Sequence, residues 1–271
     1  MADWQTRSHP WHLVEPSPWP MVGTVAALTM AIGGIWFMHG GPIWGFLAGL
    51  AILLVTFYGW WRDVVREART GVHHTPPVRT GLRIGMVLFI ASEVMFFFAF
   101  FWAFFHSSMP VLSLVAAKAW PPEGVVPLHA WTVPFLNTLI LLTSGATVTY
   151  AHHAIRLGDR PKFIKGIALT VVLGFVFLGF QAYEYIHAEF TLNGGIYGST
   201  FYLATGFHGF HVFVGACFLA VCLFRGLAGH FKPDQHVGFE AAAWYWHFVD
   251  VVWLFLFVWI YWWGGAGFKF D

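Results

Sequence analysis

Residues 16–61 read PSPWPMVGTVAALTMAIGGIWFMHGGPIWGFLAGLAILLVTFYGWW and contain no Lys, Arg, Asp or Glu. A helix needs about 20 apolar residues to cross the roughly 30 Å of hydrocarbon in a bilayer. The stretch is therefore too long for one crossing. His39-Gly40-Gly41-Pro42 interrupts it, and glycine and proline favour a turn there. These residues predict two membrane-spanning helices joined by a very short hairpin.

The rest of the chain also has the composition of a membrane protein. Of its 271 residues, 58% are hydrophobic and 10% are charged, whereas soluble domains carry about 25% charged residues. So few charges cannot cover a water-facing surface, and we expect most of the surface to face lipid. A net charge of +1 excludes the basic stripe that a nucleic-acid partner requires.

The positions of the charges predict how many times the chain crosses the membrane. We expect an all-α polytopic protein with seven transmembrane helices, forming a single membrane domain over residues 1–271. The expected helices are residues 20–38, 43–66, 80–108, 128–156, 160–187, 196–225 and 236–264. Residues 1–19 carry Trp4, Trp11 and Trp19 and lack the pattern of a signal peptide, so we expect an interfacial N-terminal arm.

Lys and Arg predict the orientation of the chain. With seven crossings, twelve of these residues, beginning with Arg7, fall on the side of the N-terminus, and two, Lys118 and Lys269, fall on the other side. Cytoplasmic loops carry the excess of positive charge. We therefore expect a cytoplasmic N-terminus.

Small residues predict close packing of the first two helices. Gly41, Gly45 and Gly49 recur every four residues. This spacing would give the second helix a smooth face, which lets helix backbones approach closely in lipid.

Glu93 is the clearest functional candidate, because ionisable groups at membrane depth are costly. Phe96, Phe97, Phe100 and Phe101 share its face of the third expected helix. Loss of water disfavours the carboxylate, so we expect a neutral acid. Such a group can serve a proton path, or it can hydrogen-bond one neighbouring helix and do nothing else.

Two acid–histidine pairs have the i, i+3 spacing of neighbours on a helix face. We interpret His247 and Asp250, in the seventh expected helix, as a structural polar pair that satisfies itself. Glu184 and His187 form a similar pair near the end of the fifth expected helix.

His208 and His211 lie one helical turn apart, a spacing that can bind a metal or haem. The spacing is unspecific without an acidic third ligand, and the chain has no motif typical of a zinc, phosphate or nucleophile site. We expect no metal site and no catalytic residue in this chain.

The charged segment after the second helix is the other candidate site. Arg62 and Arg66 are four residues apart and share a helix face, and His73 and His74 follow closely. Together they could bind a lipid phosphate through charge-assisted hydrogen bonds. The alternative is ordinary positive-inside topology, which needs the arginines but no bound lipid.

Short motifs in a fixed order along the chain indicate a family. They are PSPWP (16–20), WWRD (60–63), HHTP (73–76), SEV (92–94), FWAF (101–104), HSS (106–108), WPP (120–122), AHH (151–153), GSTF (198–201), ATGFHG (204–209), GFE (238–240) and WYWHFVDVVW (244–253). Each motif is weak alone, but their order across seven expected helices is specific. The chain resembles subunit III of cytochrome c oxidase from end to end.

The resemblance implies two-helix and five-helix bundles with a V-shaped cleft that holds phospholipids. It implies a non-catalytic subunit of a proton-pumping aa3-type terminal oxidase that packs on subunit I, with haem A and copper in partner subunits and no cofactor but lipid here. It further implies support for proton uptake, oxygen access and stability during turnover. Quinol-oxidising relatives lack the first two helices, so their presence here favours the cytochrome c branch.

The resemblance also assigns positions. Glu93 matches the family's buried carboxyl facing the cleft. The positions that match residues around lipid headgroups are Trp61, Arg62, Arg66, Glu67, His74 and Arg225.

The residues leave two other functions open. An independent secondary transporter is one, although transporters tend to show inverted repeats and broken helices, and this sequence shows neither. A haem-binding membrane electron carrier is the other, and it would use His208, His211 and His247. A composition rich in Ala, Gly and Val, with modest Met and Ser, favours a bacterial inner (plasma) membrane over the mitochondrial inner membrane.

Overall fold

The computed structural model describes residues 10–13, 15–70, 73–109, 112 and 119–269. Trp4 and Arg7 of the expected N-terminal arm, and Lys118 of the loop before the fourth helix, lie outside the described residues.

Seven helices in the described part of the chain are long and apolar enough to cross a membrane. The seven-helix, all-α, multi-pass prediction is thereby confirmed. The helices are α1 (Trp19–Met38), α2 (Trp44–Thr70), α3 (Pro76–Ser108), α4 (Val133–Arg156), α5 (Arg160–His187), α6 (Ile196–Leu227) and α7 (Val237–Leu256), which continues as a π-helical segment (Phe257–Trp263). A short antiparallel ribbon pairs β1 (Ala119–Trp120) with β2 (Phe268–Lys269).

Three helix boundaries differ by four or more residues from the expected ones, for local reasons. Helix α2 runs four residues further, because its last turn is polar and the Thr70 hydroxyl donates to Glu67 O. Helix α3 begins four residues earlier, at Pro76, since proline fits the first helical position. Helix α4 begins at Val133, five residues late, because a turn in which Thr132 donates to His129 O precedes it.

Helix α5 begins where the sequence predicted, and Asp159 caps it. The Asp159 carboxylate accepts from the Lys162 backbone at 3.1 Å and pairs with Lys162 Nζ at 2.7 Å. These contacts hold the pKa of Asp159 below its ordinary value. An anionic cap also suits the positive end of a helix dipole.

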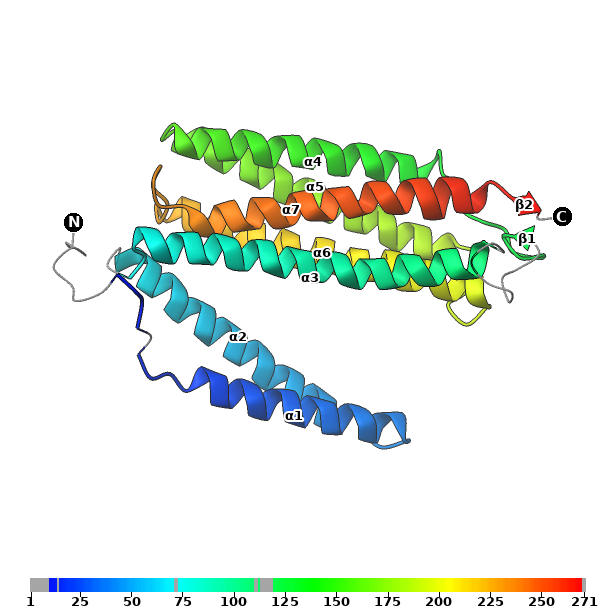
Figure 1. Ribbon diagram of the computed structural model, residues 1–271, viewed down its shortest axis with the longest axis horizontal. Coiled ribbons are helices and arrows are strands. Elements are labelled where there is room, and N and C mark those ends of the chain that lie inside the picture. Colours follow the sequence, from blue (N-terminus) through cyan, green and yellow to red (C-terminus); the bar gives the residue numbers. More distant parts are fainter. Residues whose placement is uncertain (1–9, 14, 71–72, 110–111, 113–118, 270–271) are drawn as a thin grey trace. The chain divides into compact units, whose positions relative to one another are not determined.

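The chain divides into two compact units, residues 1–82 and 83–271. In the first unit, α1 and α2 pack along each other (Figure 1). A Cβ at Gly33 would overlap the backbone of α2 at Gly45, and a Cβ at Gly49 would overlap α1 at Met30. Gly41 is not part of this face, because it lies in the turn before α2 and contacts Trp36.

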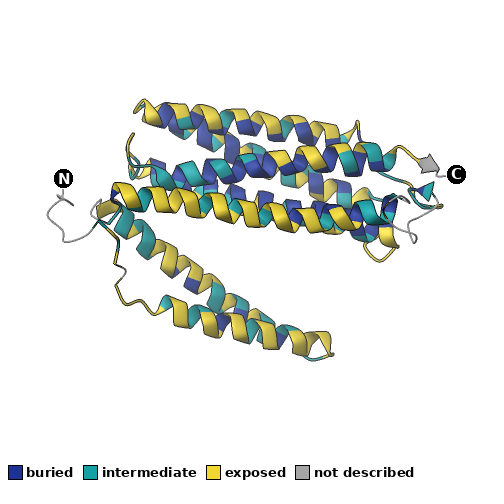
Figure 2. Cartoon of the chain, viewed as in Figure 1, coloured by how far each residue is buried: buried dark blue, intermediate teal, exposed yellow. Residues whose placement is uncertain are grey.

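In the second unit, α4, α5, α6 and α7 form a ring in which each helix packs on the next and α7 packs back on α4. Buried residues concentrate on these four helices (Figure 2). Two buried tryptophans of α7 join it to α4: Trp246 Nε1 donates to Ser144 Oγ at 2.8 Å, and Trp253 Nε1 donates to Thr138 Oγ1 at 2.9 Å.

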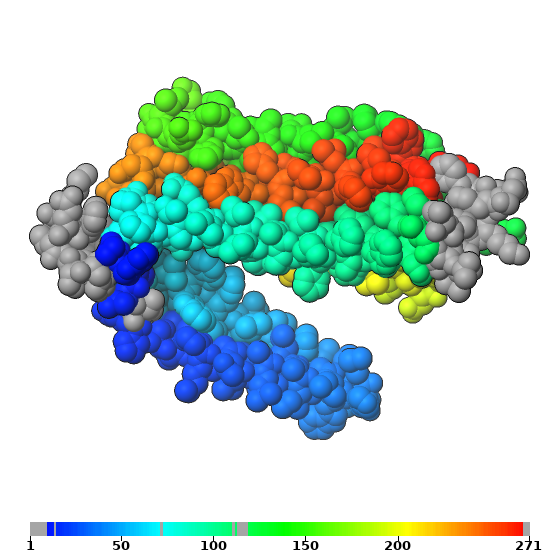
Figure 3. Space-filling model, viewed as in Figure 1, coloured from blue at the N-terminus to red at the C-terminus, as the bar shows by residue number. Residues whose placement is uncertain are grey.

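Helix α3 joins this ring through aromatic side chains. The Phe97 ring lies 5.0 Å from Phe207 of α6, and the Phe101 ring lies 4.4 Å from Phe255 of α7, centroid to centroid. In the space-filling view, side chains fill the space between α3 and α7 (Figure 3). The Phe-rich face of α3 therefore packs on the second unit, and Glu93 enters the unit with it.

Candidate lipid and proton sites

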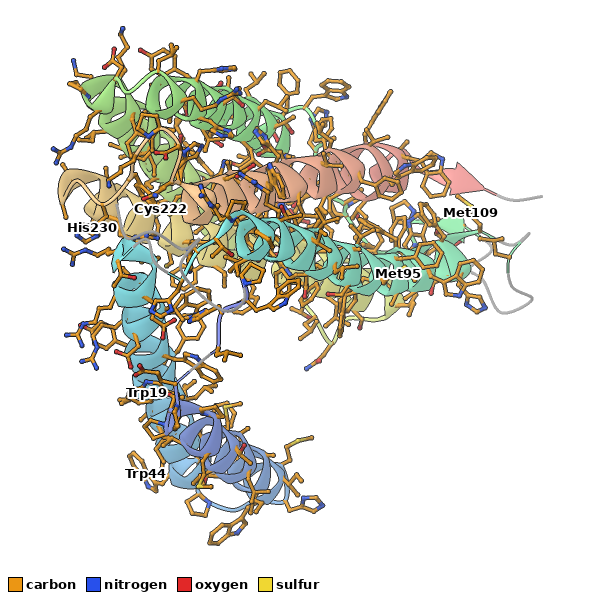
Figure 4. All side chains as sticks on the ribbon, turned by 60° about the vertical axis from the view of Figure 1, so that its left-hand side comes forward. Trp19, Trp44, Met95, Met109, Cys222 and His230 are labelled. Carbon is orange, nitrogen blue, oxygen red and sulfur yellow. The ribbon has the colours of Figure 1, made fainter. Side chains whose placement is uncertain are left out.

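Asp63 is the centre of the polar contacts in the first unit. Trp19 Nε1 at the start of α1 donates to Asp63 Oδ2 at 2.7 Å, and Figure 4 shows Trp19 where α1 lies against α2. The other oxygen, Oδ1, is 3.3 Å from Arg62 Nη2 and 3.8 Å from Arg66 Nη1. One carboxylate thus serves two guanidinium groups, which leaves the cluster with an excess of positive charge.

The two guanidinium groups remain accessible. The Arg62 and Arg66 side chains are 46% and 67% exposed. Each guanidinium has five N–H donors, and the contacts to Asp63 use few of them. Trp61 beside them is exposed, and its ring lies 5.9 Å from that of Phe57. This end of α2 thus presents the remaining N–H donors of two guanidinium groups, from Arg62 and Arg66, beside the indole ring of Trp61.

Glu67 and His74 lie in a second polar group of the same unit. His12 Nε2 is 3.6 Å from Glu67 Oε2, and the His12 ring lies 6.4 Å from His74. Burial lowers the pKa of His74, and His12 lowers it further, while Glu67 opposes the change. His74 is therefore uncharged at neutral pH and can offer a headgroup only a neutral hydrogen bond.

Arg225, in the second unit, is half-buried near the end of α6. Its guanidinium carbon lies 4.5 Å from the centre of the Phe231 ring, a cation–π contact. Its buried Nε has no hydrogen-bond partner among the described residues. A Cβ at Gly238 would approach Nη1 to 2.9 Å, so glycine leaves room for the guanidinium. An anionic ligand would satisfy this group.

Glu93 is paired with His211, whose spacing from His208 in the sequence had indicated only a possible metal or haem ligand. Glu93 Oε2 lies 2.9 Å from Nε2 of His211 on α6, and the two side chains are 17% and 5% exposed. The rings of Phe97 and Phe207 lie 5.1 and 4.5 Å from the His211 ring. The carboxyl therefore has one strong polar partner inside an aromatic shell.

The second nitrogen of His211 restricts what this pair can be. Nδ1 lies 2.7 Å from Phe207 O, and a carbonyl can only accept, so Nδ1 carries a hydrogen. Nε2 then either accepts a hydrogen bond from a neutral Glu93 or, in an imidazolium, donates to a carboxylate. In both states one proton lies between the residues and the pair has no net charge.

His208 has a different partner from His211. Its Nε2 donates to Val249 O on α7 at 3.1 Å, and its ring is fully buried. The two histidines therefore serve separate helix contacts. In the described part of the chain, no group of three or more His, Cys, Asp or Glu side chains is arranged to hold a metal ion.

The two i, i+3 pairs have different outcomes. His247 Nδ1 lies 3.3 Å from Asp250 Oδ2, as that spacing predicts. Glu184 and His187 do not pair, because Glu184 points into the unit and His187 bonds Tyr183 O on its own helix.

Glu184 instead contacts the π-helical segment. Tyr261 Oη donates to Glu184 Oε1 at 2.6 Å, and Gln181 Nε2 approaches the same oxygen at 3.3 Å. No signal in the sequence points to this contact, since the partners are 77 residues apart.

Comparisons with known proteins agree with the motifs and the fold. The family described as cytochrome c oxidase subunit III matches residues 9–265. Cytochrome c oxidase subunit 3 of Prototheca wickerhamii is 60% identical over 96% of this chain and 100% of the relative. The Marchantia polymorpha protein of that name is 58% identical over 96% and 98%, and the Carassius auratus protein is 57% identical over 95% and 98%. The chain belongs to the cytochrome c oxidase subunit III family.

Proposed function

We propose that this chain is the non-catalytic third subunit of an aa3-type cytochrome c oxidase, and that it flanks subunit I and binds phospholipid headgroups. Family membership makes it a subunit of an oxidoreductase complex. The proposal assigns haem A and copper to partner subunits. It assigns to this chain the support of proton uptake, oxygen access and stability during turnover.

One observation carries the lipid-binding part: two exposed guanidinium groups lie around a single carboxylate at the end of α2. A phosphate group would accept charge-assisted hydrogen bonds from Arg62 and Arg66, because a planar guanidinium can pair with phosphate through two parallel hydrogen bonds. The Trp61 indole suits the interface beside a headgroup. A phospholipid matches this combination better than a free anion, because its acyl chains would cover the exposed apolar surface of α2.

Arg225 supports a second headgroup position in the other unit. Its unpaired, buried Nε and its aromatic neighbour Phe231 leave a fixed cation without a carboxylate partner among the described residues. A buried cation is stable when an anion pairs with it. A phosphate at Arg225 would supply that anion.

Mass spectrometry of lipid retained by the purified oxidase tests this proposal. We expect Arg66→Ala and Arg225→Ala each to reduce the phospholipid retained per complex, because each removes the cation at one position. Arg69→Ala is the matched control: it removes the same charge from the last turn of α2, beyond Asp63. Unchanged lipid content in both Arg66→Ala and Arg225→Ala would contradict lipid binding at these positions.

The Glu93–His211 pair supports the proposal that this chain assists proton uptake. A pair that holds one proton without net charge is tolerable at membrane depth, where an isolated charge is not. We propose that Glu93 faces bound lipid and takes no part in the chemistry of oxygen reduction.

The proposed location is a bacterial inner membrane with the N-terminus in the cytoplasm. The content of Ala, Gly and Val supports the bacterial membrane, and the distribution of Lys and Arg supports the orientation.

A further inference from the structure

A second acid–histidine pair lies in the second unit, between α4 and α7. Asp250 of α7 is buried, and its Oδ2 lies 3.3 Å from His247 Nδ1. His247 Nε2 lies 3.1 Å from Oγ1 of Thr149 on α4. The three side chains thus form a continuous line of hydrogen bonds, separate from Glu93 and His211 on α3 and α6.

The threonine fixes the hydrogen on one side of the ring. The Thr149 hydroxyl donates to Gly145 O at 2.9 Å, which uses its only hydrogen. Its oxygen must then accept from His247, so Nε2 carries a hydrogen. Nδ1 either accepts from a neutral Asp250 or, in an imidazolium, donates to a carboxylate. Both states place one proton between Nδ1 and Oδ2 with no net charge on the pair.

A glycine on α4 makes room for the carboxyl. A Cβ at Gly145 would overlap Asp250 Oδ2 and would lie 3.7 Å from His247 Cε1. Glycine inside a helix costs about 1 kcal/mol relative to alanine, and here it allows the acid to approach the α4 backbone. The other oxygen, Asp250 Oδ1, is buried and has no hydrogen-bond partner among the described residues.

The surroundings leave His247 as the only charge partner of Asp250 in the described structure. On α6, His208 contacts the residue before Asp250: its Nε2 donates to Val249 O, and its ring is fully buried. From α4, Thr149 is not titratable. The two members differ in access, because the His247 side chain is 45% exposed and the Asp250 side chain 9%. His247 lies about 15 Å along α7 from its start at Val237, a depth at which an unpaired charge is costly.

We propose that Thr149, His247 and Asp250 form a proton-binding site that holds one transferable proton between the imidazole and the buried carboxyl. Transfer moves that proton from Nδ1 to Oδ2, breaks one N–H bond and forms one O–H bond. The net charge of the pair does not change. The ring is the more accessible member of the pair, and the carboxyl is the buried acceptor.

Infrared spectroscopy of the assembled oxidase tests this site. The band of the Asp250 carboxyl is identified by its loss in Asp250→Asn, in protein labelled with ¹³C at the Asp side chain. We expect His247→Gln to change the proton affinity of that carboxyl by about tenfold or more, because the substitution removes the imidazole that shares the proton with it. An Asp250 band that titrates identically in wild type and His247→Gln would overturn the proposal.

Threonine variants test the direction of the hydrogen bonds. Thr149→Val removes the acceptor for Nε2, so we expect it to shift the Asp250 band, and Thr149→Ser to restore it. Thr143→Val is the matched control, since the Thr143 hydroxyl donates to Leu139 O on its own helix. A merely structural pair would show the same band in Thr149→Val and Thr143→Val.

Glycine variants test the geometry independently. Gly145→Ala should displace Asp250 and uncouple its band from His247, while Gly179→Ala, which meets open space, should not. The amount of this chain retained in the purified complex shows whether each variant assembles. If Gly145→Ala does not assemble, the threonine series decides the question. If it assembles with the coupling intact, the proposed geometry is wrong.

Discussion

At the scale of single residues, the Glu93–His211 contact explains how α3 carries an acid through an apolar environment. Removing one partner of a buried pair typically costs about 3–5 kcal/mol, because the other is left uncompensated. His211 is held by its bond to Phe207 O, so its Nε2 is fixed in place for the carboxyl. The position of His211 thereby determines where Glu93 of α3 can form a hydrogen bond with α6.

This geometry predicts the effect of replacing Glu93. In Glu93→Gln the amide can donate to Nε2 of a neutral His211, so the contact survives. We expect the complex to assemble and the initial rate of oxygen reduction to stay within tenfold of wild type, a difference of less than about 1.4 kcal/mol in the barrier. Oxygen consumption measured immediately after dilution checks this.

Glu93→Leu provides the contrast. It leaves Nε2 of His211 without a partner in an aromatic shell, so we expect less of this chain to be retained in the purified complex. A tenfold slower initial rate in fully assembled Glu93→Gln would mean that the acid takes part in the chemistry.

The sequence identified polar residues that are costly to place at membrane depth, but it did not predict the residues with which they form hydrogen bonds. Glu93 could be identified because carboxylates are rare at membrane depth. Its contact with His211 spans 118 residues, and the contact between Trp19 and Asp63 spans 44. Such pairs depend on how the helices pack, which no local pattern encodes. The His247–Asp250 contact follows from an i, i+3 spacing on one helix, although the same spacing does not pair Glu184 with His187.

At the scale of the elements, backbone contact determines how α1 and α2 pack. Glycines on both helices face the partner, so the two backbones approach closely. In lipid, where apolar side chains gain little by leaving a solvent as apolar as themselves, such close packing is a main source of association. The regular spacing of glycines predicted this face on α2, but it included Gly41, which precedes the helix, and omitted Gly33 of α1.

Two adjacent glycines of α1 therefore differ in their tolerance of a methyl group. A Cβ at Gly33 would overlap the backbone of α2, which cannot move aside as a side chain can, whereas a Cβ at Gly34 would lie 3.5 Å from the Phe46 ring. Overpacking typically costs about 1–3 kcal/mol. We expect Gly33→Ala to lower the thermal stability of the complex and Gly34→Ala to leave it unchanged.

Retention of this chain during heating, followed by native electrophoresis, checks the glycine prediction. Both variants add the same methyl group and gain the same helix propensity, so their difference isolates packing. Equal melting of the two would show that α1 and α2 are not in close contact at Gly33.

At the scale of the whole chain, its charges determine the topology. Gaps between charged residues predicted seven crossings because a bilayer excludes charge over a fixed thickness. The division into residues 1–82 and 83–271 is less accessible from sequence, because both parts have similar composition. It depends on which helices find partners: α1 and α2 pack on each other, while α4 to α7 close a ring.

Each crossing takes the chain to the other side of the membrane, so successive loops lie on alternate sides, and the Lys and Arg distribution assigns those sides. On the proposed orientation, we expect the turn between α4 and α5 to face the cytoplasm and the loop before α4 to face outward. Leu157, in that turn, is 84% exposed, and Glu123, in that loop, is exposed. In right-side-out vesicles, a membrane-impermeant maleimide should label Glu123→Cys and not Leu157→Cys, and inverted vesicles should give the reverse. The unmodified chain reports any background from Cys217 and Cys222, which both lie within α6. Labelling of Leu157→Cys from the outside would reverse the orientation and place Arg62, Arg66 and Arg225 at the outer surface.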